Sequence, residues 1–132
     1  MFNSKVFLAE FIGTFALVFV GMSAGIVNAG LLGLALAHGF TLAVFAYAYG
    51  HISGTHVNPA VTFGLALSGT IKWGQAVFYW IAQFAGAILA AFLLKTIMAA
   101  LGGTIDAGAT VGALTEKAPV WAMVMEAVLT FF

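Results

Sequence analysis

The longest uncharged stretch of the sequence constrains the fold more than any other feature. Between Glu10 and Lys72 lie 61 consecutive residues without Asp, Glu, Lys or Arg. This is far beyond the roughly 20 apolar residues that one helix needs to cross a bilayer core. Hydrophobic residues make up 64% of the 132-residue chain and charged residues only 6%, against about 25% charged in a soluble domain. The sequence therefore predicts an all-α, multi-pass membrane protein.

Charge and cysteine content exclude several classes of function. Four Lys, with no Arg, balance four acidic residues, so no basic surface is available to bind nucleic acid. The absence of Cys excludes disulfides, thiolate metal sites and cysteine nucleophiles, and we predict no cofactor and no metal. Glu10 and Gly13 interrupt the first apolar stretch, which is unlike a cleavable signal. We therefore expect residue 1 to begin the functional protein.

Three apolar segments have the length of a membrane span, at about residues 6–27, 31–50 and 74–97. Each carries small residues four positions apart, a spacing that lets a neighbouring helix approach closely. These stripes are Gly21 and Gly25; Ala35, Gly39 and Ala43; and Ala82, Gly86 and Ala90. We expect close helix packing along them. The aromatic residues Trp73, Phe78, Tyr79 and Trp80 are interpreted as interfacial belt and packing.

Residues 51–68 do not fit a spanning helix. The segment His51–Val57 is small and polar, and is expected to be extended. Asn58 and Pro59 then predict a helix start, because Asn is a favoured cap and Pro suits the first turn. That helix lasts about ten residues and is too short to cross a bilayer. Non-helical backbone at membrane depth is tolerated where it lines a watery cavity, so the segment predicts a re-entrant loop and a pore.

A second copy of the first segment begins near the C-terminal end. Residues 98–119 are rich in glycine and carry three charges, which predicts a solvent loop. Residues 119–132 start another apolar run, in which Glu126 and the residues after it match the segment around Glu10. We therefore divide the chain into a first repeat, residues 1–118, and the start of a fourth span. Three membrane crossings separate the two copies. Because this number is odd, the second copy would enter the membrane from the opposite side, inverted relative to the first.

The motif in residues 51–62, His-Ile-Ser-Gly-Thr-His-Val-Asn-Pro-Ala-Val-Thr, resembles the first signature loop of the aquaporins, the major intrinsic proteins. Residues 9–15, 82–87 and 125–132 resemble the family's first, third and fourth helices. A typical member is nearly twice as long, with six spans and two Asn-Pro-Ala half-helices that meet at mid-membrane. The resemblance therefore implies that this chain corresponds to the N-terminal half of an aquaporin.

The resemblance also implies a function and a setting. The expected function is a passive channel for water, extending to small neutral solutes such as ammonia, urea or glycerol. The expected partners are the lipid bilayer and further copies in a homotetramer, and the expected location is the plasma membrane, with the N-terminus in the cytoplasm. The four lysines divide two against two between the sides and do not fix this orientation. A half-channel that conducts nothing unless paired with a second half is the alternative. An intramembrane enzyme is set aside, because the sequence has no His-Glu-x-x-His pattern and no nucleophile with a base.

The motif assigns complementary roles to the residues of the pore. The half-helix that begins at Asn58-Pro59-Ala60 aims its positive end at the pore centre, and the Asn58 amide donates hydrogen bonds to a solute. The backbone carbonyls of Gly54, Thr55 and His56 are expected to accept hydrogen bonds in the same lumen. By resemblance, Leu17 and Leu42 form the opposite apolar wall.

Several further polar positions carry competing interpretations. By resemblance, His38 lies at the position of the family's narrow constriction. A histidine at this position resembles plant vacuolar-type members, some of which pass ammonia or urea. The alternative is a histidine whose polar atoms are satisfied by helix contacts. Glu10 and Glu126 are expected to support re-entrant loops by accepting from backbone amides, rather than to act as an acid–base pair. Glu126 is predicted as the partner of the loop around His56, whose ring is a brace. His51 is expected to end the second span at the interface.

Overall fold

The computed structural model describes residues 3–103 and 117–131, which form five helices and no strand. They are α1 (Ser4–Ile26), α2 (Gly30–Ser53), α3 (Pro59–Leu67), α4 (Trp73–Ala100) and α5 (Pro119–Phe131). Three of them, α1, α2 and α4, are long and apolar enough to cross a membrane. The all-α membrane fold predicted from the sequence is confirmed.

Two helices extend further than the sequence indicated. The last turn of α2 includes residues 51–53, which were expected to be extended, and the helix ends only at Gly54. Gly54 has a φ of 81° and donates its N–H to the Gly50 carbonyl at 2.9 Å, a common helix ending for glycine. Likewise α4 continues to Ala100. Most of the predicted solvent loop, residues 104–116, lies outside the described residues.

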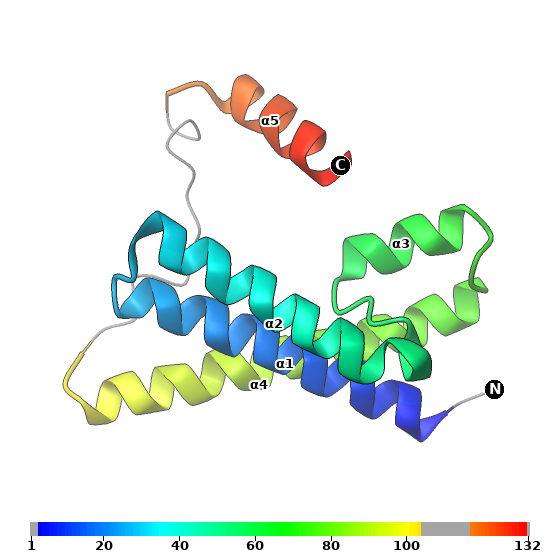
Figure 1. Cartoon of the computed structure of the whole chain (residues 1–132), viewed down its shortest axis with the longest axis horizontal. Helices are drawn as coiled ribbons and strands as arrows, with labels where there is room; N and C mark the ends of the chain where they lie inside the picture. Colours follow the sequence, from blue (N-terminus) through cyan, green and yellow to red (C-terminus); the bar gives the residue numbers. More distant parts are fainter. Residues whose placement is uncertain (1–2, 104–116, 132) are drawn as a thin grey trace.

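Helix α1 lies at the centre of the bundle, between α2 and α4, while α3 packs against α4 (Figure 1). The α1–α4 contact is close because a Cβ added to Gly86 would overlap the carbonyl oxygen of Phe11. Ala82 and Ala90, which flank Gly86 on the same stripe, are fully buried. The close packing predicted for the third span is therefore confirmed.

The stripe on the second span behaves differently. Ala35, Gly39 and Ala43 are exposed, and nothing lies within 4 Å of a Cβ added to Gly39. The prediction of close packing there is wrong for the described structure, because α2 turns another face to α1. On that face the His38 ring covers Gly21, whereas the second glycine of the α1 stripe, Gly25, stays open.

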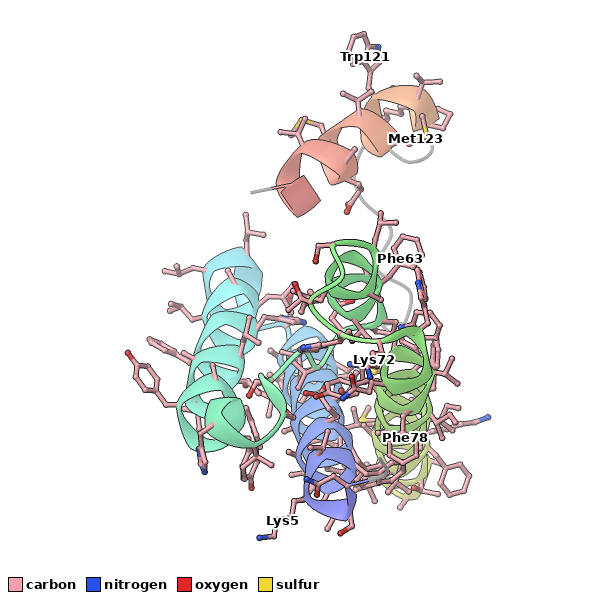
Figure 2. All side chains as sticks on the ribbon, turned by 90° about the vertical axis from the view of Figure 1, so that its right-hand side faces the viewer. Lys5, Phe63, Lys72, Phe78, Trp121 and Met123 are labelled. Atoms are coloured by element: carbon pink, nitrogen blue, oxygen red, sulfur yellow. The ribbon has the colours of Figure 1, made fainter. Side chains whose placement is uncertain are left out.

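The outer surface of the bundle formed by α1–α4 is apolar. The outward residues of α2 include Leu31, Phe40 and Tyr47, which are mostly exposed. No contact joins α5 to the other helices in the described part of the chain. Figure 2 shows Trp121 of α5 pointing away from the bundle, and Trp121 and Met123 are both mostly exposed. Buried polar side chains, by contrast, gather where α1 and α4 meet the segment between α2 and α3.

Candidate functional site: the re-entrant loop and its carboxylate

One carboxylate organises the loop between α2 and α3. Glu10 of α1 is completely buried. Its Oε1 accepts hydrogen bonds from the Ser53 hydroxyl at 2.6 Å and the His56 N–H at 2.9 Å. Its Oε2 accepts from the Val57 N–H at 2.7 Å and the Gln83 side-chain amide at 2.8 Å. Four donors from three parts of the chain therefore converge on one acceptor-only group.

This geometry corrects the prediction that Glu126 is the partner of the loop around His56. Glu126 is exposed on α5, which has no contact with the loop in the described structure. Glu10 takes that place because α1 runs along α4 and beside the end of α2, where the loop begins. The sequence pointed to both carboxyls but did not tell which of them lies beside the loop.

The backbone of the loop has a donor side and an acceptor side. The four N–H groups of residues 54–57 all donate within the protein: to the Gly50 carbonyl, to the Ser53 hydroxyl oxygen and twice to Glu10. No hydrogen bond to a carbonyl oxygen of residues 54–57 is found among the described residues. The loop therefore has four backbone carbonyls without a hydrogen-bond donor among the described residues, and no backbone N–H left unbonded.

The loop conformation needs this support. Thr55 and Val57 have φ values of 49° and 40°, a region that is costly for β-branched residues, at about 1–3 kcal/mol each. The hydrogen bond from the Val57 N–H to Glu10 holds this turn. The Val57 side chain lies on Gly13, where an added Cβ would meet Val57 Cγ1 at 2.5 Å. Gly13 is thus needed for the close approach of the loop to α1.

Asn58 begins the half-helix as the sequence indicated. Its φ of −151° is extended, its Oδ1 accepts the Ala60 N–H at 2.8 Å, and Pro59 occupies the first turn of α3. Because the oxygen is engaged in the cap, the exposed NH2 group of Asn58 remains as a donor. Loop acceptors and an amide donor thus follow one another along the chain.

Two aromatic side chains of α4 hold the segment in place, a role that the sequence analysis missed. Tyr79 is buried and donates its hydroxyl to the Ser53 carbonyl at 2.7 Å. The Trp80 ring N–H donates to the Pro59 carbonyl at 3.0 Å. The packing predicted for these two residues is therefore confirmed, and the hydrogen bonds to the loop and to α3 add to it.

A chain of side-chain hydrogen bonds links Glu10 to the His56 ring. The second N–H of the Gln83 amide donates to Thr62 Oγ1 at 2.9 Å, and Thr62 Oγ1 lies 3.0 Å from His56 Nδ1. Because no other acceptor for the Thr62 hydroxyl hydrogen is found among the described residues, we assign this hydrogen to His56 Nδ1. His56 is then neutral, with its proton on Nε2. Gln83 and Thr62 are both fully buried and were not singled out from the sequence.

Comparison with known proteins places this site in a family. The family model of the major intrinsic proteins matches residues 1–132. The chain belongs to the major intrinsic protein family. Aquaporin Z of Rhodopseudomonas palustris is 46% identical over 108 residues, covering 76% of this chain and 45% of the relative. Aquaporin TIP2-1 of Arabidopsis thaliana is 41% identical over 139 residues, 96% of this chain and 53% of the relative. Aquaporin NIP2-3 of Zea mays is 41% identical over 134 residues, covering 96% of this chain and 42% of the relative.

The chain spans about half the length of these curated relatives. The predicted resemblance to the N-terminal half of an aquaporin is confirmed by the match of the family model and by this coverage.

The other predicted pore residues of this major intrinsic protein lie on α1 and α2. His38 is exposed; its Nδ1 donates to the Leu34 carbonyl at 2.9 Å while its ring covers Gly21. Leu17 is half-buried on α1, and Leu42 is 44% exposed on α2. His51 is exposed in the last turn of α2. In the described ranges, no group of three His, Cys, Asp or Glu side chains could hold a metal ion.

Proposed function

We propose that this chain is the first repeat of a passive channel for water that also admits small neutral solutes such as ammonia, urea or glycerol. The observation that carries the proposal is the division of the loop into bonded N–H groups and unbonded carbonyls. A solute that loses its hydration shell in a narrow passage needs such replacement partners. The carbonyls of residues 54–57 supply acceptors, and the Asn58 amide supplies a donor. The names of the relatives, all called aquaporins, agree with this assignment.

The same arrangement is unfavourable to cations. The N-terminus of α3 begins at Asn58 and carries the positive end of the helix dipole. The one carboxylate of the loop region, Glu10, is buried behind four donors and does not line the passage. A cation would therefore meet a positive helix end without a counter-charge. We propose that Leu17 and Leu42 form the apolar wall opposite the loop and that His38 sets the size and polarity of the constriction.

A second candidate is a half-channel that conducts nothing until it is paired with a second half. It is favoured by the exposure of the side of α3 that faces away from α4, where Val61 is 46% and Leu67 is 69% exposed. The open stripe on α2 is a further surface that a second half could cover. By the match between the two segments, we propose that Glu126 supports the loop of that second half, as Glu10 supports this one.

The wider setting is also a proposal. The apolar outer surface of α2 suits contact with lipid or with neighbouring copies. From the resemblance to aquaporins we propose a homotetramer in the plasma membrane. Crosslinking in native membranes and fractionation of the cell would test these two statements. No catalytic step is proposed.

Osmotic swelling of proteoliposomes, followed by stopped flow, tests the function. The full-length protein should accelerate the osmotic swelling of the proteoliposomes. If the second candidate function holds, the 132-residue chain alone should not accelerate it. Asn58→Asp should lower water permeability and raise cation conductance, because the added charge offsets the helix end. Asn28→Asp is the matched control, since Asn28 lies in the turn between α1 and α2 with a φ of 52° that Asp tolerates. Equal water and ion permeability in wild type and Asn58→Asp would refute the pore role.

A further inference from the structure

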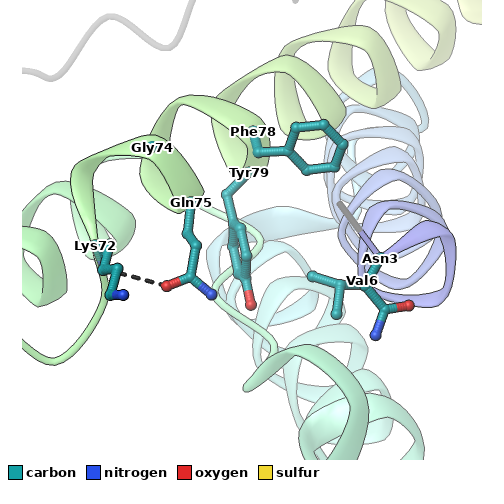
Figure 3. A pocket seen from close by; sticks show the side chains of 7 residues that line it. All are labelled: Asn3, Val6, Lys72, Gly74, Gln75, Phe78 and Tyr79. Atoms are coloured by element: carbon teal, nitrogen blue, oxygen red, sulfur yellow. Dashed lines mark hydrogen bonds between the residues drawn. The ribbon is translucent and has the colours of Figure 1, made fainter. Parts of the chain in front are cut away.

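A cavity of about 610 Å³ opens at the N-terminal ends of α1 and α4. It lies between the start of α1 and the first two turns of α4 (Figure 3). Its lining residues are Asn3, Val6, Lys72, Gly74, Gln75, Phe78 and Tyr79. None of them is a predicted pore residue. The volume falls within the range of small-molecule sites, about 300–1,000 Å³.

The polar lining of this cavity consists of donors. The Asn3 side-chain oxygen already accepts the Lys5 N–H at 3.0 Å, and the Gln75 side-chain oxygen accepts the Lys72 N–H at 3.2 Å. Each amide therefore keeps its NH2 group for a ligand. The Tyr79 hydroxyl is turned to the Ser53 carbonyl. Lys72 forms no ion pair with any described residue, so its ammonium is uncompensated there.

The remaining walls are apolar and come from Val6 and the rings of Phe78 and Tyr79, which face the cavity in Figure 3. A ligand that fits needs anionic oxygens for the donors and an apolar part for these walls. The cavity also lies where two membrane-spanning helices begin, at the depth of lipid headgroups. An anionic phospholipid meets all three conditions, whereas free phosphate meets only the first.

We propose that this cavity binds the phosphate of an anionic phospholipid. The Lys72 ammonium and the NH2 groups of Asn3 and Gln75 contact the phosphate oxygens. The glycerol end of the lipid lies against Val6. This inference concerns a site outside the channel path and holds whether or not the proposed channel function does.

The test is lipid retention by the full-length protein. The protein is placed in nanodiscs of phosphatidylcholine with a minor fraction of phosphatidylglycerol, and the phosphatidylglycerol that stays bound after transfer to detergent is measured by native mass spectrometry. Lys72→Gln should lower the preference for phosphatidylglycerol about fivefold, the effect of roughly one lysine at a membrane surface. Lys95→Gln is the matched control, because Lys95 is also exposed on α4 but lies near the other end of the helix.

A second variant separates loss of binding from loss of folding. Asn3→Asp keeps the cap oxygen that accepts the Lys5 N–H, and Asp caps helices as well as Asn does. It replaces a donor in the cavity by a negative charge, so phosphatidylglycerol retention should fall while thermal stability stays unchanged.

Each result of this experiment decides the proposal. Reduced retention in Lys72→Gln and Asn3→Asp, with wild-type retention in Lys95→Gln, supports the lipid site, provided that excess inorganic phosphate does not displace the lipid. Displacement by inorganic phosphate would overturn the lipid as the occupant and assign the cavity to a phosphate from solution. Equal retention in all proteins, or an equal loss in Lys95→Gln, would overturn the site itself.

Discussion

Glu10 and Glu126 stand at matching places in two similar segments, and the structure gives them opposite surroundings. Glu10 is fully buried and accepts four hydrogen bonds, whereas Glu126 is exposed on a helix without contacts to the bundle in the described ranges. A carboxylate in an apolar helix is costly unless donors surround it. The local sequence therefore identifies a carboxylate that can accept hydrogen bonds from a loop. The carboxylate has this role only where a loop lies beside it.

The strongest test of this comparison is Glu10→Gln, with Glu126→Gln as its control. Each oxygen of Glu10 accepts two donors, so either orientation of a glutamine places an NH2 group against two buried donors. At about 1–3 kcal/mol for each unsatisfied group, Glu10→Gln should lower the free energy of unfolding by about 3 kcal/mol or more. Glu126→Gln should change the stability of the 132-residue chain by less than about 0.5 kcal/mol, as at other surface sites.

Equilibrium unfolding in mixed micelles, followed by circular dichroism, measures both changes. Equal destabilisation by the two variants would show that the carboxylates have equivalent surroundings, and the comparison would be wrong. A stable Glu10→Gln protein would show that the loop is held by something other than this carboxylate.

The next largest effect concerns the close approach that brings α4 to Glu10. Gly86→Ala should lower stability by about 1–3 kcal/mol, because the new methyl group would overlap the Phe11 carbonyl and push the two helices apart. Gly39→Ala is the control, since nothing lies near a Cβ at that position of α2. There the better helix propensity of Ala should leave the chain unchanged or stabilise it by up to about 1 kcal/mol. Thermal unfolding of both variants checks the difference. Equal destabilisation by the two variants would mean that the close α1–α4 contact at Gly86 is no more sensitive to an added methyl group than the open position at Gly39.

A smaller effect is expected further along the hydrogen-bond chain. Thr62→Val should cost about 1–2 kcal/mol, because one Gln83 N–H and His56 Nδ1 lose their partner. The same variant should change the His56 ring. Nitrogen NMR should show the Nε2–H tautomer in the wild type and a mixture of tautomers in Thr62→Val. The control is Thr41→Val, whose hydroxyl bonds only to the Ala37 carbonyl of its own helix. A wild-type His56 with its proton on Nδ1 would contradict the direction assigned to the hydrogen bond between Thr62 and His56.

These outcomes separate what local sequence determines from what it does not. The three spans and the half-helix at Asn58 were predictable, because apolar length and a cap followed by proline act within a few residues. The choice of Glu10 over Glu126, and the roles of Tyr79 and Trp80, were not predictable in this way. Each depends on which helix lies beside the loop, and uncharged apolar helices present several similar faces to a neighbour. The extra turn of α2 has the same origin, because polar Ser53 is accommodated by a hydrogen bond to Glu10 on another helix.

The smallest effect on stability, and the one most directed at solute choice, is expected at His38, which lies outside the Glu10 network. His38 is exposed; its Nδ1 donates to the Leu34 carbonyl, and its Nε2 edge lies against Gly21. His38→Phe should change stability by less than about 1 kcal/mol, because one local hydrogen bond is lost. It should reduce urea and ammonia permeability of the full-length protein more than water permeability, since an apolar ring makes the proposed constriction less polar. Stopped-flow measurements with each solute give the ratios, and His51→Phe, at the exposed end of α2, is the matched control. Identical ratios in wild type and His38→Phe would show that His38 only packs on Gly21, and would remove it from the proposed pore.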